Sequence, residues 1–193
     1  LKFAKKNRFV IICGGGKTAR NYMNAASAVT KLTLEDLDWL GIHATRLNAQ
    51  LLRNVFRDTA HPRVVRNPNE KINTRKKIII AAGWKPGNST DYVAVMLAKN
   101  LGTTKIINIT NTDYVYDKDP AKFKTAKPVN IICWKHFKQL IGTKWSPGLN
   151  SPFDPVAARE AQRNNFSVAI LGKNLQNLEG YLNNKKFAGT LIF

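Results

Sequence analysis

Residues 78–102 read IIIAAGWKPGNSTDYVAVMLAKNLG and contain three structural signals in a row. The apolar run at 78–82 is short and continuous, which is typical of a strand buried on both faces. Glycine and proline then predict a loop at 83–89, and a helix is predicted over 91–100, where Gly102 closes it. Strand, loop and helix in this order predict one unit of a parallel α/β sheet.

The same order occurs near the start of the chain. Residues 9–13 form an apolar run that predicts another strand buried on both faces, and three glycines and a helix from about residue 17 follow. Thr33 and Asp36 then form a Thr-x-x-Asp cap, and apolar residues at three- and four-residue steps predict a long helix that ends near residue 57. A short strand is predicted at 63–66.

The second half of the chain continues the alternation. Strands are predicted at 105–110, 167–171 and 189–193, and helices at 134–141, 155–163 and 175–182. Asp154 is the predicted N-cap of the middle helix, and polar loops are predicted at 117–130 and 142–153. Strands that alternate with helices predict an α/β fold with a mostly parallel, helix-covered sheet, which binds ligands at the carboxyl ends of its strands.

The composition is that of a globular protein. Hydrophobic residues make up 44% of the 193 residues and charged residues 22%, which excludes disordered and collagen-like classes. No apolar run approaches the roughly 18 residues of a membrane-spanning helix, and no signal peptide is recognisable. Cys13 and Cys133 stand beside isoleucines without zinc-site spacing, so we expect buried thiols. These features predict a single domain over residues 1–193 and a cytoplasmic protein.

The charge balance is unusual for such a chain. Lys and Arg number 31 against 12 Asp and Glu, a net charge of +19 that attracts polyanions, either nucleic acids or phosphorylated small molecules. The basic residues are spread along the chain and form no single block of 5 to 8 residues. This spread favours a solvated basic surface and argues against a nucleic-acid partner.

Two glycine-rich turns are candidates for phosphate binding. Residues 14–20, GGGKTAR, join a strand to a helix, where backbone N–H groups can approach a phosphate and Lys17 or Arg20 adds charge. Residues 83–91, GWKPGNSTD, place hydroxyls, an amide and a carboxylate at a second helix start. Each turn is also explained by ordinary requirements, glycine geometry in the first and an N-cap in the second. Together they suggest two phosphorylated ligands.

A third turn carries acidic and aromatic residues, and the histidines lie apart from any nucleophile. Residues 110–120, TNTDYVYDKDP, bring three aspartates and two tyrosines to the end of a strand, where they can hold a ribose, a base or a metal, or cap a solvated turn. His43, His61 and His136 stand beside no obvious nucleophile. Phosphoryl transfer by positioning and charge neutralisation therefore fits better than covalent catalysis.

Taken in order, five segments resemble the amino acid kinase superfamily and, within it, the archaeal-type uridylate (UMP) kinases. These segments are GGGKTARNY at 14–22, DWLGIHATRLNAQLL at 38–52, PGNSTDYVAVMLA at 86–98, ITNTDYVYDKDP at 109–120 and FDPVAAR at 153–159. The resemblance implies a three-layer αβα sandwich with a mostly parallel central sheet. It also implies a transferase of pyrimidine nucleotide biosynthesis that moves the γ-phosphate of ATP to UMP, with Mg²⁺ bridging the ATP phosphates. The family enzymes are typically homohexamers.

The resemblance also implies roles for individual residues. The catalytic positions match Arg20 and Asp91, and no residue matches a metal ligand. The positions that bind UMP match Gly15, Asp38, Trp84, Lys85, Pro86, Gly87, Asn88, Ser89 and Thr90. The positions near ATP match Gly16, Arg20, Thr110, Tyr116 and Asp119.

Three departures from the family pattern are evident. The family's first strand and its Gly-Gly-Ser loop have no counterpart, so we expect an N-terminally incomplete domain. Trp84 stands where Thr is usual, and Tyr114 replaces the Gly of an Asn-x-Asp-Gly-Val-Tyr pattern. Tyr114 is expected either to strain its turn through a positive φ or to direct its ring toward ATP. The alternatives to a UMP kinase are a catalytically degenerate nucleotide- or polyanion-binding relative and a basic nucleic-acid-binding module.

Overall fold

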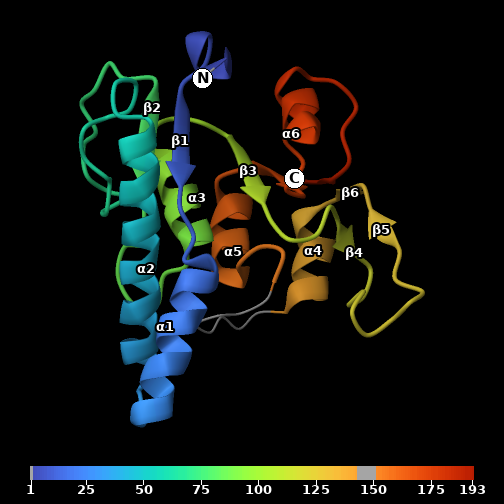
Figure 1. Cartoon of the computed structure of the whole chain (residues 1–193). Coiled ribbons are helices and arrows are strands. Elements are labelled where there is room, and N and C mark those ends of the chain that lie inside the picture. Colours follow the sequence, from blue (N-terminus) through green and yellow to red (C-terminus); the bar gives the residue numbers. More distant parts are fainter. Residues whose placement is uncertain (1, 143–150) are drawn as a thin grey trace. The chain divides into compact units, whose positions relative to one another are not determined.

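The computed structural model describes residues 2–142 and 151–193 (Figure 1). These residues form two compact units, the first comprising residues 2–100 and the second residues 101–142 and 151–193. Most of the loop predicted at 142–153 lies outside the described residues. No helix among the described residues is long and apolar enough to cross a membrane.

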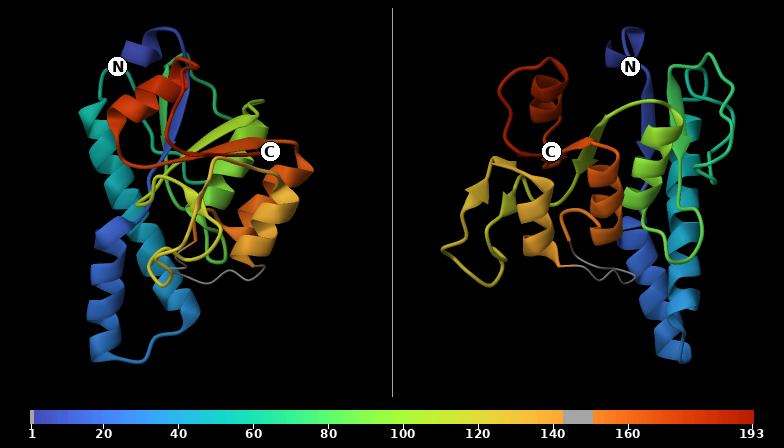
Figure 2. Two further views of the ribbon diagram at one scale, coloured as in Figure 1. Left: turned by 90° about the vertical axis from the view of Figure 1, so that its right-hand side faces the viewer. Right: turned by 180° about the vertical axis from the view of Figure 1, so that it is seen from behind.

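The first unit contains a parallel strand pair and three α-helices. In chain order its elements are the 3₁₀-helix η1 (Lys2–Lys5), β1 (Phe9–Ile12), α1 (Gly16–Val29), α2 (Leu34–Val55), β2 (Ile78–Ala81) and α3 (Thr90–Asn100). Strands β1 and β2 pair in parallel from Phe9↔Ile78 to Ile12↔Ala81. Both strands therefore end at the same edge, and the helices α1 and α2 form a long hairpin beside them (Figures 1 and 2).

Helix α2 begins as predicted and packs on the core of this unit. The Thr33 hydroxyl accepts from the Asp36 N–H at 3.1 Å, and the Asp36 carboxylate accepts from the Thr33 N–H at 2.9 Å, which completes the capping box. Ala49 of α2 is buried against Ala60 and against Ile78 and Ile80 of β2. This packing holds α2 along the strand pair and sets the position of its polar residues.

Three predictions for this unit differ in detail from the structure. All of β2 is buried, but the residues of β1 are only half-buried, because among the described residues β1 pairs with β2 alone. The strand predicted at 63–66 is reduced to a single bridge between Val65 and Ala81, since the charged residues Arg63 and Arg66 flank a very short apolar segment. The long helix ends at Val55, two residues before the predicted end.

The second unit contains a four-stranded sheet, a small hairpin and three helices. Its elements are β3 (Lys105–Ile109), β4 (Val115–Tyr116), β5 (Pro128–Val129), β6 (Ile131–Ile132), α4 (Trp134–Ile141), α5 (Pro155–Arg163), β7 (Ser167–Leu171), α6 (Leu175–Leu182) and β8 (Thr190–Ile192). The sheet order is β3-β7-β8-β6; β7 and β8 are antiparallel, and the other two pairs are parallel. The predicted α/β class with mostly parallel strands is confirmed.

Local signals in this unit were confirmed where they were strong. The Asp154 carboxylate caps α5 by accepting from the N–H groups of Val156 and Ala157, and Pro155 is the first helical residue. The antiparallel pair β4 and β5 was missed, because strands of two residues have no periodic pattern; β4 directly precedes the lysine-rich segment 117–130 and β5 lies within it. Both cysteines are free thiols, as expected, but they are half-buried where buried thiols were expected. Burial nevertheless raises the pKa of Cys13.

Candidate functional site

The two glycine-rich turns of the first unit lie at the same edge of its strand pair. The first glycine loop (residues 14–16) follows β1, and the second glycine loop (residues 83–89) follows β2. Because Ile12 is in register with Ala81, both loops leave the carboxyl ends of parallel strands side by side. Helix α2 contacts both loops, so one helix fixes their spacing.

The first glycine loop opens α1 and leaves its amides available. Gly15 is the N-cap, Gly16 has a φ of +57°, and no side chain of a described residue caps the helix. A Cβ on Gly15 would lie 2.5 Å from the Ala19 Cβ, so only glycine fits here. From α2, the Asn48 amide donates to the carbonyls of Gly14 at 2.8 Å and Gly15 at 3.2 Å. The uncapped N–H groups of this helix start can bind an anion.

The cations beside this helix start are open to solvent. Lys17 and Arg20 are exposed in the first turns of α1, and neither forms a hydrogen bond or ion pair with another described residue. An unpaired guanidinium one turn from uncapped amides is suited to bidentate contact with a phosphate.

The second glycine loop is held tightly by α2. The Gly87 N–H, in a residue with a φ of +80°, donates to the Asp38 carboxylate at 2.6 Å. The Gly83 N–H donates to the Thr45 hydroxyl at 2.7 Å, and the Arg46 guanidinium donates to the Trp84 carbonyl at 2.8 Å. These bonds pin the loop at three points along its length.

Burial changes the electrostatics of these anchors. Asp38 is only 9% exposed, and burial raises the pKa of its carboxyl group, while the N–H of Gly87 acts in the opposite direction. Burial, and secondarily the charge of Arg66, lowers the pKa of Arg46. The partly desolvated Asp38 carboxylate, which accepts from the Gly87 N–H, therefore anchors the second loop to α2.

The second loop ends in a side-chain cap, as one of the sequence interpretations proposed. The Ser89 hydroxyl accepts from the Tyr92 N–H at 3.1 Å at the start of α3. The Lys85 ammonium lies 4.3 Å from the centroid of the Trp84 ring, which is a cation–π contact. Thr90 and Asp91 are half-buried in the first turn of α3.

The structure brings one part of the predicted site together. The residues that gather at the carboxyl edge of β1 and β2, or on the helices beside it, are Gly15, Gly16, Arg20, Asp38, Trp84, Lys85, Pro86, Gly87, Asn88, Ser89, Thr90 and Asp91. The remaining predicted residues, Thr110, Tyr116 and Asp119, belong to the second unit.

In the second unit these residues lie in or near the turn after β3. The Thr110 N–H donates to the Leu171 carbonyl at 2.8 Å, which places it at the carboxyl ends of β3 and β7. Tyr116 belongs to β4, and the Asp119 carboxylate accepts from the Ala121 N–H at 2.9 Å and so closes a turn. Tyr114 has no positive φ, so the expected backbone strain is absent.

Sequence reasoning missed several residues that position the site. Thr45, Arg46 and Asn48 bind the two loops from α2, and Asp38 and Thr45 are buried polar residues seven positions apart on one helix face. That spacing was the available signal. Gly172 was also missed; a Cβ there would lie 1.8 Å from the Asp113 carboxylate, so the Asp113 side chain lies directly over the end of β7.

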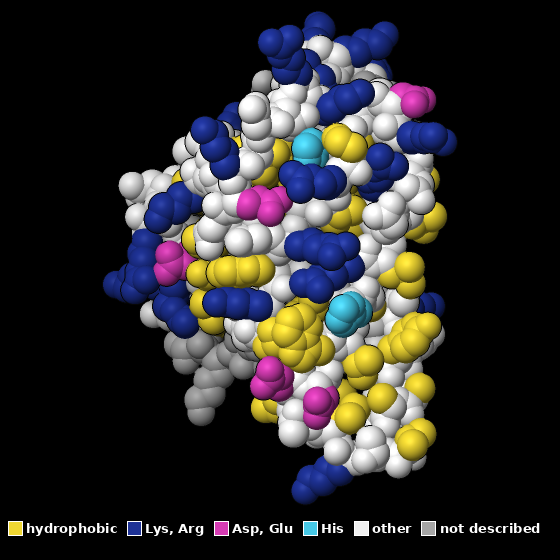
Figure 3. Space-filling view, turned by 90° about the vertical axis from the view of Figure 1, so that its left-hand side faces the viewer, with side chains coloured by type: hydrophobic (Ala, Val, Ile, Leu, Met, Phe, Trp, Pro, Cys, Tyr) yellow, Lys and Arg dark blue, Asp and Glu magenta, His cyan; other side chains and the backbone are white. Residues whose placement is uncertain are grey.

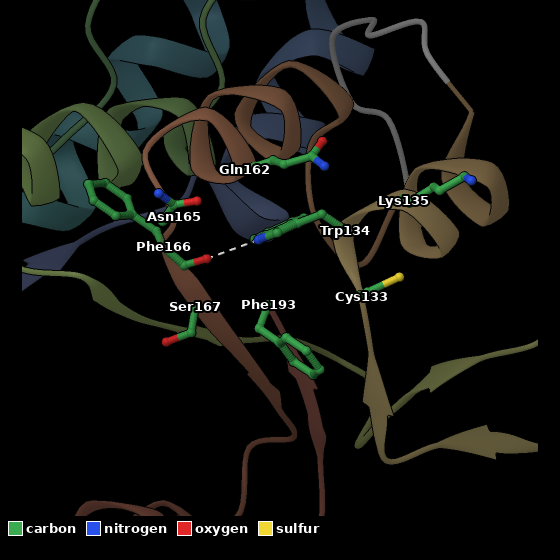
Figure 4. Close-up of a pocket in the computed structure, with 8 residues that line it drawn as sticks. All are labelled: Cys133, Trp134, Lys135, Gln162, Asn165, Phe166, Ser167 and Phe193. Carbon is green, nitrogen blue, oxygen red and sulfur yellow. Dashed lines mark hydrogen bonds between the residues drawn. The ribbon is translucent and has the colours of Figure 1, made fainter.

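A separate cavity lies in the second unit. It has a volume of about 410 Å³ and is bounded by the start of α4, the end of α5 and the ends of β7 and β8 (Figure 4). The Trp134 indole N–H donates to the Phe166 carbonyl at 2.9 Å in its wall. Ser167, at the amino end of β7, lines it, so the cavity is at the sheet edge opposite Thr110 and contains no predicted site residue.

Comparison with known proteins gives a consistent result. The amino acid kinase family matches residues 1–172. The uridylate kinase of Pyrococcus abyssi is 37% identical over 177 residues, which are 89% of this chain and 77% of that protein. The uridylate kinase of Methanococcoides burtonii is 35% identical over 173 residues, 88% of this chain and 74% of that protein.

Solved structures agree with the sequence relatives. The uridylate kinase from Archaeoglobus fulgidus matches with a TM-score of 0.83 and 27% identity over 100% of this chain and 88% of that one. The UMP kinase from Ureaplasma parvum has a TM-score of 0.76 at 20% identity, over 99% of this chain and 84% of that one, which shows a shared fold. The chain belongs to the amino acid kinase family, and it is similar to the archaeal uridylate kinases described above.

Proposed function

We propose that this protein is a UMP kinase, which transfers the γ-phosphate of ATP to UMP and releases UDP and ADP. The observation that carries the proposal is the pair of glycine loops at one strand edge, both bound by α2. The family membership and the uridylate kinase relatives support the same activity. The two compact units then together form one kinase domain.

The two loops have different tasks in this proposal. The uncapped amides of the first glycine loop and the Arg20 guanidinium bind the phosphate of UMP. The second glycine loop, from Trp84 to Thr90, contacts the nucleoside, with Asp91 beside it. Asp38 is a positioning residue, since its carboxylate binds the Gly87 N–H and so fixes the shape of the loop.

The chemical step needs alignment and charge neutralisation more than covalent catalysis. A phosphate oxygen of UMP attacks the γ-phosphorus of ATP, the bond from that phosphorus to the β–γ bridging oxygen breaks, and ADP leaves. Arg20 and the backbone N–H of Gly16 neutralise the negative charge that develops on the transferred phosphoryl group.

ATP is the proposed phosphate donor, with Thr110, Tyr116 and Asp119 as its contacts in the second unit. Mg²⁺ bound to ATP supplies further charge neutralisation. No group of three or more His, Cys, Asp or Glu gathers anywhere in residues 2–142 and 151–193. The ion is expected to take ligands from the ATP phosphates and from water.

A homo-oligomer, a hexamer by resemblance, and a role in cytoplasmic pyrimidine nucleotide synthesis complete the proposal. Leu47, Leu51 and Val55 lie on successive turns of α2 and are 60%, 67% and 67% exposed, which is apolar surface that a second copy of the chain can cover. Light scattering should give a multiple of the 21.6 kDa chain mass, and Leu51→Glu should lower that multiple. A monomer in the unaltered protein would contradict this part.

The experiment for the activity is a coupled assay of ADP release with UMP, CMP and AMP as acceptors. Turnover with UMP well above the other two is expected. Absence of turnover with UMP would overturn the proposal. UMP and ATP binding without turnover would favour the catalytically degenerate relative.

A further inference from the structure

Nearly half of the net charge is concentrated in two short segments. Residues 5–8 and 57–77 contain ten Lys and Arg residues and two acidic residues, a net charge of +8 out of +19 in 25 of the 193 residues. We call the cations of these segments the amino-edge patch; they are Lys5, Lys6, Arg8, Arg57, Arg63, Arg66, Lys71, Arg75, Lys76 and Lys77. Five of them are arginines, half of the ten in the chain.

The fold brings the two segments together. The Phe9 N–H donates to the Lys77 carbonyl at 2.8 Å, and the Arg8 guanidinium donates to the Thr74 carbonyl at 3.3 Å. The His61 N–H donates to the Ile78 carbonyl at 2.8 Å, so residues 60 and 61 reach the same end of the strands. Lys and Arg side chains crowd the upper part of the face shown in Figure 3.

The charge of the patch is poorly neutralised within the chain. Its hydrogen bonds go to backbone carbonyls, as in the 2.6 Å bond from Lys76 to the Asp58 carbonyl, and no patch cation forms a salt bridge with a carboxylate of the described residues. The pKa of the nearby His61 is affected by this surplus of positive charge. Burial lowers the pKa of His61, and Arg63 and Arg8 lower it further, against the opposite effect of Glu70.

The chemistry of the patch selects among polyanions. Neither segment contains an exposed large hydrophobic side chain, so the patch lacks the anchors that membrane surfaces and protein interfaces normally engage. Arginine, lysine and the amides of Asn67, Asn69 and Asn73 are the groups that contact sugar and phosphate in nucleic acids. We propose that the amino-edge patch binds the phosphate backbone of RNA without regard to base sequence.

Most of this surface is separate from the proposed UMP site. Most of the patch lies at the amino ends of β1 and β2, whereas both glycine loops lie at the carboxyl ends. The exceptions are Arg63 and Arg66, which flank Val65, and Val65 is bridged to Ala81 at the carboxyl end of β2. The four-residue strands between the two ends span about 13 Å. RNA bound at the amino ends of the strands therefore leaves the glycine loops accessible, and the proposal does not depend on kinase activity.

The test is fluorescence anisotropy with a labelled 20-nucleotide RNA of mixed sequence between 50 and 300 mM KCl. The patch variant replaces three exposed lysines, Lys5→Gln, Lys71→Gln and Lys77→Gln. The control variant makes the same chemical change at three exposed lysines of the second unit, Lys124→Gln, Lys185→Gln and Lys186→Gln. Both variants lose the same charge, so they separate the patch from the overall charge of the protein.

The patch variant is expected to bind RNA at least tenfold more weakly at 150 mM KCl. In a plot of the logarithm of the association constant against the logarithm of the KCl concentration, its slope is expected to decrease in magnitude by about 2, since each lost contact to a single-strand phosphate removes roughly 0.7 from the slope. The control should change affinity less than threefold, and saturating UMP should not compete. Equal losses in the two variants, competition by UMP, no salt-dependent binding, or binding to phosphatidylserine vesicles in preference to RNA would each overturn the proposal. Equal melting temperatures verify that both variants are folded.

Discussion

The two glycine loops leave the same edge of the same strand pair, yet they are built in opposite ways. The second loop is bound by Asp38, Thr45 and Arg46 of α2 and capped by Ser89. The first is bound through carbonyls alone, by Asn48, and its helix start has no side-chain cap. A loop with several backbone donors already bonded, as at Gly83, Gly87 and Asn88, can shape a pocket, while a loop whose donors are unsatisfied can bind an anion.

The largest effect is expected where the anion binds. Arg20→Ala removes an exposed guanidinium that has no partner among the described residues, so the melting temperature should stay constant. UMP affinity should fall by roughly 10- to 150-fold, because charge-assisted hydrogen bonds contribute about 1.5–3 kcal/mol. Calorimetry measures the affinity, and uridine, which lacks the phosphate, should bind Arg20→Ala and the unaltered protein equally. Unchanged UMP affinity would remove Arg20 from the site.

Within the first loop, Gly15 and Gly14 form a matched pair. Gly15→Ala places a Cβ 2.5 Å from that of Ala19 and should lower the free energy of unfolding by about 1–3 kcal/mol while displacing the anion-binding amides. Gly14→Ala has open space around it and should be tolerated. Chemical denaturation and UMP titration of both variants provide the comparison. Equal stability of the two would show that the loop is less closely packed than described.

A smaller effect is expected from weakening the anchor of the second loop. Asp38→Asn keeps an oxygen acceptor for the Gly87 N–H but loses the charge, so UMP affinity should fall by roughly fivefold, or about 1 kcal/mol. Unlike Arg20→Ala, this variant should weaken uridine by the same factor, because the loop contacts the nucleoside. A loss confined to UMP would instead indicate that Asp38 acts on the phosphate.

The smallest effect is expected from the protonation of Asp38, which should make UMP binding and stability depend on pH. Burial raises the pKa of Asp38 above its ordinary 3.8, so acidification should protonate it earlier than an exposed Asp and weaken UMP binding a few-fold. The effect of acidification on stability has the opposite sign to its effect on UMP binding. The native state holds this proton more tightly than the unfolded chain, so the Asp38 contribution to stability decreases as pH rises from 3.8 through the raised pKa. Calorimetry and denaturation at several pH values should show both trends in the unaltered protein and neither in Asp38→Asn.

Local and periodic signals made much of the fold predictable. The capping box at Thr33, the cap at Asp154 and both glycine loops follow from short-range chemistry that tertiary structure did not override. The resemblance identified the family through the same segments. Because each of these features depends on neighbouring residues, a single sequence was sufficient.

Features that depend on distant residues were not predictable in this way. Thr45 and Arg46 appear as ordinary residues of a long helix until the fold places loop amides and carbonyls 38 positions away beside them. The basic residues at 5–8 and 57–77 appear scattered until the pairing of β1 with β2 joins the two segments. The clustering of the basic residues and the bonds from α2 to the loops depend on how the chain folds. Neither can be predicted from the spacing of residues along the sequence.

Hydrogen exchange with and without saturating UMP tests most directly the claim that the two loops form one UMP site. Mass spectrometry of peptides suits the proposed oligomer and reports on backbone amides. Protection is expected in residues 14–20, where unsatisfied amides gain the phosphate, and more weakly in 84–91, where the amides of Gly87 and Asn88 are already bonded. Protection absent from both segments, or confined to residues 105–119 of the second unit, would contradict the account.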